Sequence, residues 1–264
     1  MALARTAAVV IGSFPLGESD RAVTFYSREL GKVRGVAKAA RRMKSRFSGA
    51  LELFTQGELV LFDTGRSDLV RIDHFDVEHP FQRVRGDLER LGQASWMVEC
   101  VTRLTADRDR HPALYGLLVR SLRAMEESPV PAWIAVCFAA RCLDALGHRP
   151  RLDRCTECGR PYPFPAAHLD EGGIVCDGCA AHGGGTPISA AAAMALHRVR
   201  SLRWEEAITA PERGQGEVRA VLEAHMSRLI GYPTRTTKFL REIRRVSGVS
   251  GERPSTVTAP PFPE

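Results

Sequence analysis

Short apolar runs separated by turn-forming residues characterise the first eighty residues of the chain. Ala7–Ile11 is a continuous apolar run, and the cluster Pro15–Asp20 that follows it is typical of a turn. Apolar and β-forming residues continue, with breaks at glycine or polar residues, over 22–27, 32–38, 51–63 and 69–77. About five short strands in this length predict a small β-barrel.

From Pro80 onwards, the apolar residues recur every three to four positions, which is the period of a helix that faces a core. This spacing predicts helices over 88–104 and 114–125. Trp133–Leu146 is apolar on nearly every face, so we expect it at the centre of a helical bundle. The helical pattern resumes in three later segments, namely an alanine-rich segment capped by Ser189, then Glu217–Ile230, then Thr236–Val246.

Two CxxC pairs interrupt the helical region and are separated by seventeen residues. Each pair presents two thiolates from one tight turn, for which Gly159 and Gly178 supply backbone freedom. The loop between the pairs is long enough to bring both turns around one tetrahedral ion. We therefore predict one structural Zn²⁺ with a closed ligand set: Cys155, Cys158, Cys176 and Cys179. Two disulfides or four free thiols are the alternative.

The composition is that of an ordinary soluble globular protein, with 264 residues, of which 44% are hydrophobic and 26% charged. This length suggests two domains, or one domain with an insert. No apolar run approaches the roughly 18 residues of a membrane span, and residues 1–10 do not resemble a signal peptide. Cys100, Cys137 and Cys142 lie in apolar helical segments, as expected of free thiols in a reducing cytoplasm.

A formal net charge of +6 points weakly to a polyanionic partner, so the position of the charge matters more than its sum. Eight basic residues lie between Arg28 and Arg46, where Glu29 is the only acid, whereas the rest of residues 1–80 has four basic and nine acidic residues. Cations that follow a phosphate backbone on a small barrel are typical of single-strand binding. The predicted DNA contacts are Lys32, Arg34, Lys38, Arg41, Arg42, Lys44 and Arg46.

Two features of this stretch remain open to a second interpretation. The basic run could be a solvated loop after a strand. The aromatic residues Phe25, Tyr26 and Phe47 at its edges could stack on bases, but we favour their burial in the core.

A second basic stretch lies in the last predicted helix, where cations surround apolar residues. It could hold an acidic peptide on an apolar floor, or it could be an ordinary amphipathic helix whose cations favour its own C-terminus. The residues proposed for such a partner are Arg235, Lys238, Phe239 and Arg241.

Motifs of catalysis are scarce. The sequence has no Walker-type phosphate loop, no GxGxxG after a strand and no recognisable nucleophile elbow. His74 and His79 lie near several acids, which would allow a hydrolase, but their spacing matches no helical ligand pair. We therefore do not expect an enzyme.

In their order along the chain, these motifs resemble those of the RecO family of bacterial recombination mediators. Gly17–Arg21 is similar to the family's first hairpin turn, and Gly31–Lys38 with the cations that follow it is similar to its basic third-strand region. Leu152–Cys155 resembles the start of the family's zinc module, and Lys238–Glu242 resembles its C-terminal helix.

The resemblance implies an α+β multidomain protein in which an OB-fold barrel precedes a helical domain carrying the Cys₄ zinc module. The expected domains are the barrel over 1–80, the helical domain over 81–150 and 186–246, the zinc module over 151–185 and a disordered tail over 247–264.

The resemblance also implies a function. Proteins of the family bind single- and double-stranded DNA, anneal complementary strands, and work with RecR to load RecA onto strands coated by single-strand-binding protein, whose acidic tail docks on the helical domain. We expect such a protein in the cytoplasm, associated with the nucleoid. The alternative is a zinc-ribbon factor that acts on RNA or in transcription and touches nucleic acid through the zinc module itself, although the loop 160–175 carries a single arginine.

Overall fold

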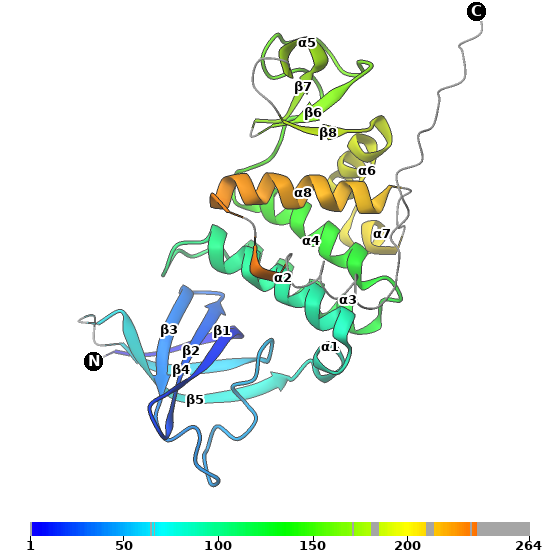
Figure 1. Cartoon of the computed structure of the whole chain (residues 1–264). Coiled ribbons are helices and arrows are strands. Elements are labelled where there is room, and N and C mark those ends of the chain that lie inside the picture. Colours follow the sequence, from blue (N-terminus) through cyan, green and yellow to red (C-terminus); the bar gives the residue numbers. More distant parts are fainter. Residues whose placement is uncertain are drawn as a thin grey trace, which may run out of the picture.

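The computed structural model describes residues 2–63, 65, 67–170, 172–180, 185–209, 214–232 and 234–236. An N-terminal barrel lies at one end of the molecule, helices occupy the middle, and the small module with the four cysteines lies beyond them (Figure 1). The tail predicted over 247–264 lies outside the described residues.

Five strands form a closed barrel: β1 (Ala2–Leu16), β2 (Asp20–Ser27), β3 (Gly31–Ala37), β4 (Gln56–Asp63) and β5 (Leu69–His79). Their order around the barrel is β1-β2-β3-β5-β4, and β4 pairs with β1 to close it. Every pairing is antiparallel except that of β3 with β5. This is the OB-fold topology, so the predicted fold class is confirmed.

Alternation along β1 gives the barrel two buried faces. Ala8 and Val10 point into the barrel and join its core, whereas Val9 and Ile11 pack against the helices on the outside. Tyr26 of β2 also belongs to the helical core. The barrel is therefore docked on the helical domain through one side of its wall.

The fourth strand begins later than the sequence predicts, at Gln56 instead of residue 51. Leu51 and Phe54 are buried, but the backbone around them forms turns, and Phe54 has the left-handed φ of 72°. Leu51 joins the core of the barrel and Phe54 joins the core of the helical domain, so a loop with buried apolar residues resembles a strand in the sequence pattern.

The helical domain contains α1 (Gln82–Gly86), α2 (Leu88–Leu104), α3 (Pro112–Glu127), α4 (Pro131–Ala145), α6 (Ala190–Ser201), α7 (Trp204–Thr209) and α8 (Gln215–Ile230). α4 packs against α2, α3, α6, α7 and α8, which confirms its predicted central position. Ser189 caps α6 as predicted, because its hydroxyl accepts a hydrogen bond from the Ala192 N–H at 3.2 Å. Beyond Thr236, the last predicted helix lies outside the described residues. No helix of the described residues has the length and apolar character needed to cross a membrane.

The cysteine module consists of β6 (Ala167–Leu169), β7 (Ile174–Cys176), the short α5 (Asp177–Ala180) and β8 (Thr186–Ile188). Its three strands have the order β7-β6-β8, and Leu169 and Ile174 are fully buried. Arg228 of α8 binds this sheet by donating to the Leu169 carbonyl at 2.8 Å and to the Thr186 hydroxyl at 3.0 Å. α8 therefore fixes the module on the helical domain.

Candidate nucleic-acid interface and metal centre

The loop between β3 and β4 carries most of the predicted DNA contacts. Successive turns shape it, with backbone bonds from Arg42 N to the Ala39 carbonyl at 3.2 Å and from Ser45 N to the Arg42 carbonyl at 3.0 Å. Asp20 fixes its start by accepting from the Ala39 N–H at 2.8 Å, and buried Phe47 fixes its far part. The loop is therefore anchored at both sides and presents its cations from a defined backbone.

Three cations at the tip of this loop are exposed. Arg41 donates to the Gly17 carbonyl at 2.9 Å, which joins the loop to the β1–β2 turn. The side chains of Arg42 and Lys44 form no hydrogen bond or ion pair with any residue that the structure describes. We name Arg41, Arg42 and Lys44 the loop cations.

Two further predicted contacts, Lys38 and Arg46, flank the loop cations and are exposed although each has an acid partner. Lys38 Nζ lies 2.8 Å from Asp20 Oδ2, and Arg46 lies 3.6 Å from Asp73. The hydrogen bonds from Lys38 and from the Ala39 N–H lower the pKa of the Asp20 carboxyl. Exposed pairs of this kind are weak, so both cations can exchange the acid for a phosphate.

The cations of β3 itself are placed differently. Lys32 is only 11% exposed at its side chain, and its Nζ donates to the carbonyls of Thr102 and Thr105 at 2.7 Å each. These carbonyls belong to the C-terminal end of α2, where a cation satisfies otherwise unpaired acceptors. The prediction that Lys32 contacts DNA is therefore not supported by its position. Arg34 is half exposed but lies 2.5 Å from Asp107.

The aromatic residues at the edge of the basic stretch belong to the core, as we favoured. Phe25 and Tyr26 are fully buried and Phe47 is 2% exposed. The exposed aromatic side chain of the described barrel residues is Phe14, at 66%. The sequence pattern did not single it out, because a bulge between Val10 and Gly12 shifts the alternation of β1 just before it.

The four cysteines come together as their spacing predicts. The Sγ atoms of Cys155, Cys158, Cys176 and Cys179 all lie within 4.8 Å of one another, and those of Cys158 and Cys176 are 3.8 Å apart. Tetrahedral zinc–sulfur bonds of about 2.3 Å would place sulfur atoms about 3.8 Å apart. Gly159 has the expected left-handed φ of 74°, but Gly178 does not, because it lies in α5.

The thiol chemistry fits a cation at the centre of this group. Burial alone would raise the pKa of Cys155, but backbone N–H groups of Cys158, Cys176 and Glu157 point at its sulfur and lower the pKa to about 6. The thiols of Cys176 and Cys158 raise the pKa of Cys179 to about 12. Four sulfurs so close cannot all ionise unless a cation lies between them. The set can therefore hold a metal ion.

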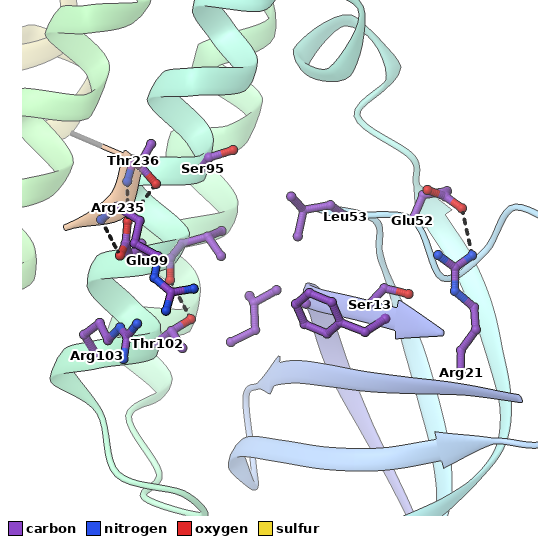
Figure 2. A pocket seen from close by; sticks show the side chains of 14 residues that line it. Ser13, Arg21, Glu52, Leu53, Ser95, Glu99, Thr102, Arg103, Arg235 and Thr236 are labelled. Carbon is purple, nitrogen blue, oxygen red and sulfur yellow. Dashed lines mark hydrogen bonds and ion pairs between the residues drawn. The ribbon is translucent and has the colours of Figure 1, made fainter. Parts of the chain in front are cut away.

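The second basic stretch is described only at its start. The N–H of Arg235 donates to one Glu99 carboxylate oxygen at 2.9 Å, and the Thr236 N–H and hydroxyl donate to the other at 2.9 and 2.7 Å. Figure 2 shows Arg235 and Thr236 beside α2 on one wall of a groove. Lys238, Phe239 and Arg241 lie outside the described residues.

The two histidines of β5 lie beside different acids. His74 Nδ1 lies 3.0 Å from Asp73 and its Nε2 3.3 Å from Asp76, whereas His79 faces Glu126 at 3.5 Å. Among the described residues, the cysteines are the group of three or more ligands close enough to hold a metal.

Comparisons with known proteins agree with this architecture. A barrel of OB topology joined to a helical domain with a tetracysteine module defines the class. The family model "Recombination protein O N terminal" matches residues 1–81, and "Recombination protein O C terminal" matches residues 85–238. The chain belongs to the RecO family of DNA repair proteins.

Curated relatives match over nearly their whole length. The DNA repair protein RecO of Anaeromyxobacter dehalogenans (strain 2CP-1) is 35% identical over 93% of this chain and 98% of its own. The RecO proteins of Geobacter sulfurreducens and Frankia casuarinae are each 34% identical, over 90% and 86% of this chain and 98% and 93% of their own.

Proposed function

We propose that this protein is a non-enzymatic recombination mediator that binds single- and double-stranded DNA through its barrel and anneals complementary strands. With RecR, it helps to load RecA onto strands coated by single-strand-binding protein. The observation that carries this proposal is the group of exposed loop cations on an OB barrel of a DNA repair family. Such a protein works on the chromosome in the bacterial cytoplasm.

The proposed phosphate contacts are the predicted set without Lys32, whose ammonium group already serves the end of α2. They are Arg34, Lys38, Arg41, Arg42, Lys44 and Arg46. Phosphate groups replace the weak acid partners of some of these cations and meet no competitor at Arg42 and Lys44.

Annealing follows from charge neutralisation. Two single strands repel each other through their phosphates, and cations on the barrel screen that repulsion. The strands can then meet, and base pairing supplies the free energy of the reaction. No nucleotide hydrolysis is required.

Zn²⁺ is the proposed metal of the cysteine site, because four thiolates in tetrahedral arrangement are a structural zinc set. Bound there, it would hold the two CxxC turns together and leave no position open for a substrate. Cys155, Cys158, Cys176 and Cys179 would serve the fold of the module.

Protein partners belong to the same proposal. The acidic tail of single-strand-binding protein would dock on the helical domain, with Arg235 and, beyond the described residues, Lys238, Phe239 and Arg241 as its cationic and apolar contacts. RecR would bind the same protein while the barrel holds DNA.

Annealing of two complementary oligonucleotides coated with the cognate single-strand-binding protein tests the proposal. The protein should accelerate annealing without ATP, and RecR with RecA should then form filaments on a coated strand. Failure to bind or anneal DNA would refute the mediator function. Stronger binding to RNA than to single-stranded DNA would favour the zinc-ribbon alternative.

A further inference from the structure

A groove of ≈ 390 Å³ separates the outer face of β1 from helix α2. Figure 2 shows Arg21 and Glu52 on the barrel side of this groove, and Glu99, Arg103 and Arg235 on the side of the helix. Apolar side chains from both walls line the space between these polar groups, among them Phe14 and Val98. The groove is thus apolar at its centre and charged at its borders.

Phe14 differs from the other apolar residues that line this groove because it is 66% exposed, whereas Ile11 and Val98 are buried. In the register of the sheet it lies opposite Ala22, whose small side chain leaves the ring uncovered. Gly12 lies beside it, and a Cβ there would stand only 3.4 Å from the ring carbon Cε2. Small neighbours on two sides therefore keep the ring of Phe14 accessible.

The charges at the borders of the groove favour an anionic ligand. Glu52 and Arg21 pair at 3.3 Å and neutralise each other, and Glu99 accepts the backbone N–H groups of Arg235 and Thr236, so the excess positive charge lies on Arg103 and Arg235. Arg103 donates to the hydroxyl of Tyr232 and keeps its full charge. The Arg235 side chain forms no ion pair with any described residue.

The groove is continuous with the loop cations. Pro15, the next residue after Phe14, lies opposite Arg21 in the register of β1 and β2. Gly17, at the turn where β1 ends, accepts the hydrogen bond from Arg41. A chain that follows β1 from the groove therefore reaches Arg21 and then the loop.

We propose that Phe14 is a stacking platform for one unpaired base of single-stranded DNA, held in this groove between β1 and α2. The proposal rests on the function proposed above and adds the residue that recognises a base. Aromatic rings of single-strand-binding barrels stack on bases of any sequence because every base has a π-face. Arg103, and Arg21 once a phosphate replaces its weak partner Glu52, would meet the phosphates on either side of the stacked base.

An acidic peptide is the competing occupant, and the continuity of charge argues against it. A short peptide would occupy only the groove. A DNA strand would also contact Arg21 and the loop cations, which continue the groove along one path. The flat, uncovered ring of Phe14 also suits a base better than a flexible side chain.

The test compares Phe14→Leu, which keeps apolar volume but removes the π-face, with Phe14→Trp, which retains the π-face. Phe14→Leu should weaken binding of a single-stranded oligonucleotide roughly 5- to 150-fold, the range measured when stacking aromatics are removed. Phe14→Trp should bind the oligonucleotide about as tightly as the wild type. Affinity for duplex DNA, the salt slope and the melting temperature should not change, because the side chain is exposed and uncharged.

Photocrosslinking provides an independent readout in the full-length protein. An oligonucleotide with 5-iododeoxyuridine should crosslink to Phe14, as located by mass spectrometry. If Phe14→Leu binds single strands like the wild type and no crosslink forms there, the stacking proposal is wrong, while the mediator function stands as long as the wild type binds and anneals. Wild type that fails to bind single strands would instead refute the mediator function.

A peptide with the acidic tail sequence of the cognate single-strand-binding protein separates the two occupants. If Phe14→Leu weakens binding of this peptide and leaves the affinity for single-stranded DNA unchanged, the groove is a peptide site and the proposal is overturned. If it weakens DNA binding alone, the proposal is supported.

Discussion

The barrel loop and the cysteine module both bring groups of like charge together, but they orient these groups differently. In the module, four sulfur atoms converge within 4.8 Å, a geometry that is satisfied by one cation inside the group. In the loop, Arg41, Arg42 and Lys44 point outward from a fixed backbone and find little in the described chain to neutralise them. The first arrangement serves the fold, and the second is ready for an external polyanion.

Lys32 shows that sequence position alone does not decide between these two roles. It belongs to the same basic stretch as the loop cations, yet it binds the end of α2 and joins the barrel to the helical domain. A buried cation with internal partners contributes to stability, whereas an exposed cation that is unpaired or only weakly paired is available to a ligand.

Removal of the metal should have the largest effect and should be confined to the module. Apparent zinc binding of roughly 10–16 kcal/mol can fold a segment that has little core of its own. Cys155→Ser, or a chelator, should therefore unfold the module or cause aggregation, and elemental analysis of the wild type should give about one zinc per chain. Cys137→Ser, at a buried free cysteine away from the cluster, is the control for thiol loss. A metal-free Cys155→Ser protein of full stability would contradict the account.

Neutralisation of the loop cations should have the next largest effect, on DNA affinity and not on folding. Replacing Arg41, Arg42 and Lys44 by alanine should weaken single-strand binding roughly 50-fold at 0.15 M salt, since each lost phosphate contact changes the salt slope by about 0.7. The melting temperature should stay constant because the side chains are exposed. Fluorescence anisotropy with a labelled oligonucleotide measures the change.

A control with the same loss of charge is available elsewhere on the surface. Arg5, Arg83 and Arg203 are exposed and distant from the loop in sequence, and their joint replacement by alanine should leave affinity within a few-fold of wild type. Equal weakening by both triple variants would mean that net charge, and not the loop, holds DNA.

Lys32→Met should lower the stability of the protein and leave its DNA affinity nearly unchanged, which is the reverse of the result expected for the loop cations. Loss of its two charge-assisted hydrogen bonds should lower the free energy of unfolding by about 1.5–3 kcal/mol, as measured by urea denaturation. Single-strand affinity should change little when the protein is folded. A Lys32→Met variant with wild-type stability and weak DNA binding would show that Lys32 contacts DNA.

The smallest expected effect concerns acid stability at the junction of the barrel and the helical domain. Burial disfavours the charged form of Asp107, but Lys32 and then Arg34 outweigh it and lower the pKa of its carboxyl. The unfolded chain binds this proton first as pH falls, so the contribution of Asp107 is complete above pH ~4 and is lost as pH falls through its lowered pKa. Asp107→Asn should remove less than about 1 kcal/mol at pH 7 and flatten the acid limb of the stability curve. An unchanged acid limb would show that Asp107 does not stabilise this junction.

The metal site and the barrel can both be predicted from the sequence because local residue patterns determine them. The CxxC spacing predicts the metal site because each pair forms one turn, and alternation of apolar residues predicts the barrel. The fate of Lys32 depends on the end of α2, seventy residues away in the chain, and local patterns contain no such information. Phe14 was missed for a similar reason, since its exposure follows from a bulge in β1 and from its small neighbours Gly12 and Ala22.

The salt dependence of single-strand affinity tests the central claim most directly, because its slope counts the phosphates that the protein neutralises. If about five of the six proposed cations contact DNA at once, the wild type should show a slope near −3.5, and the variant without Arg41, Arg42 and Lys44 a slope near −1.4, whereas Lys32→Met should match the wild type. The same slope in the triple variant as in the wild type would contradict the assignment of DNA binding to the barrel loop.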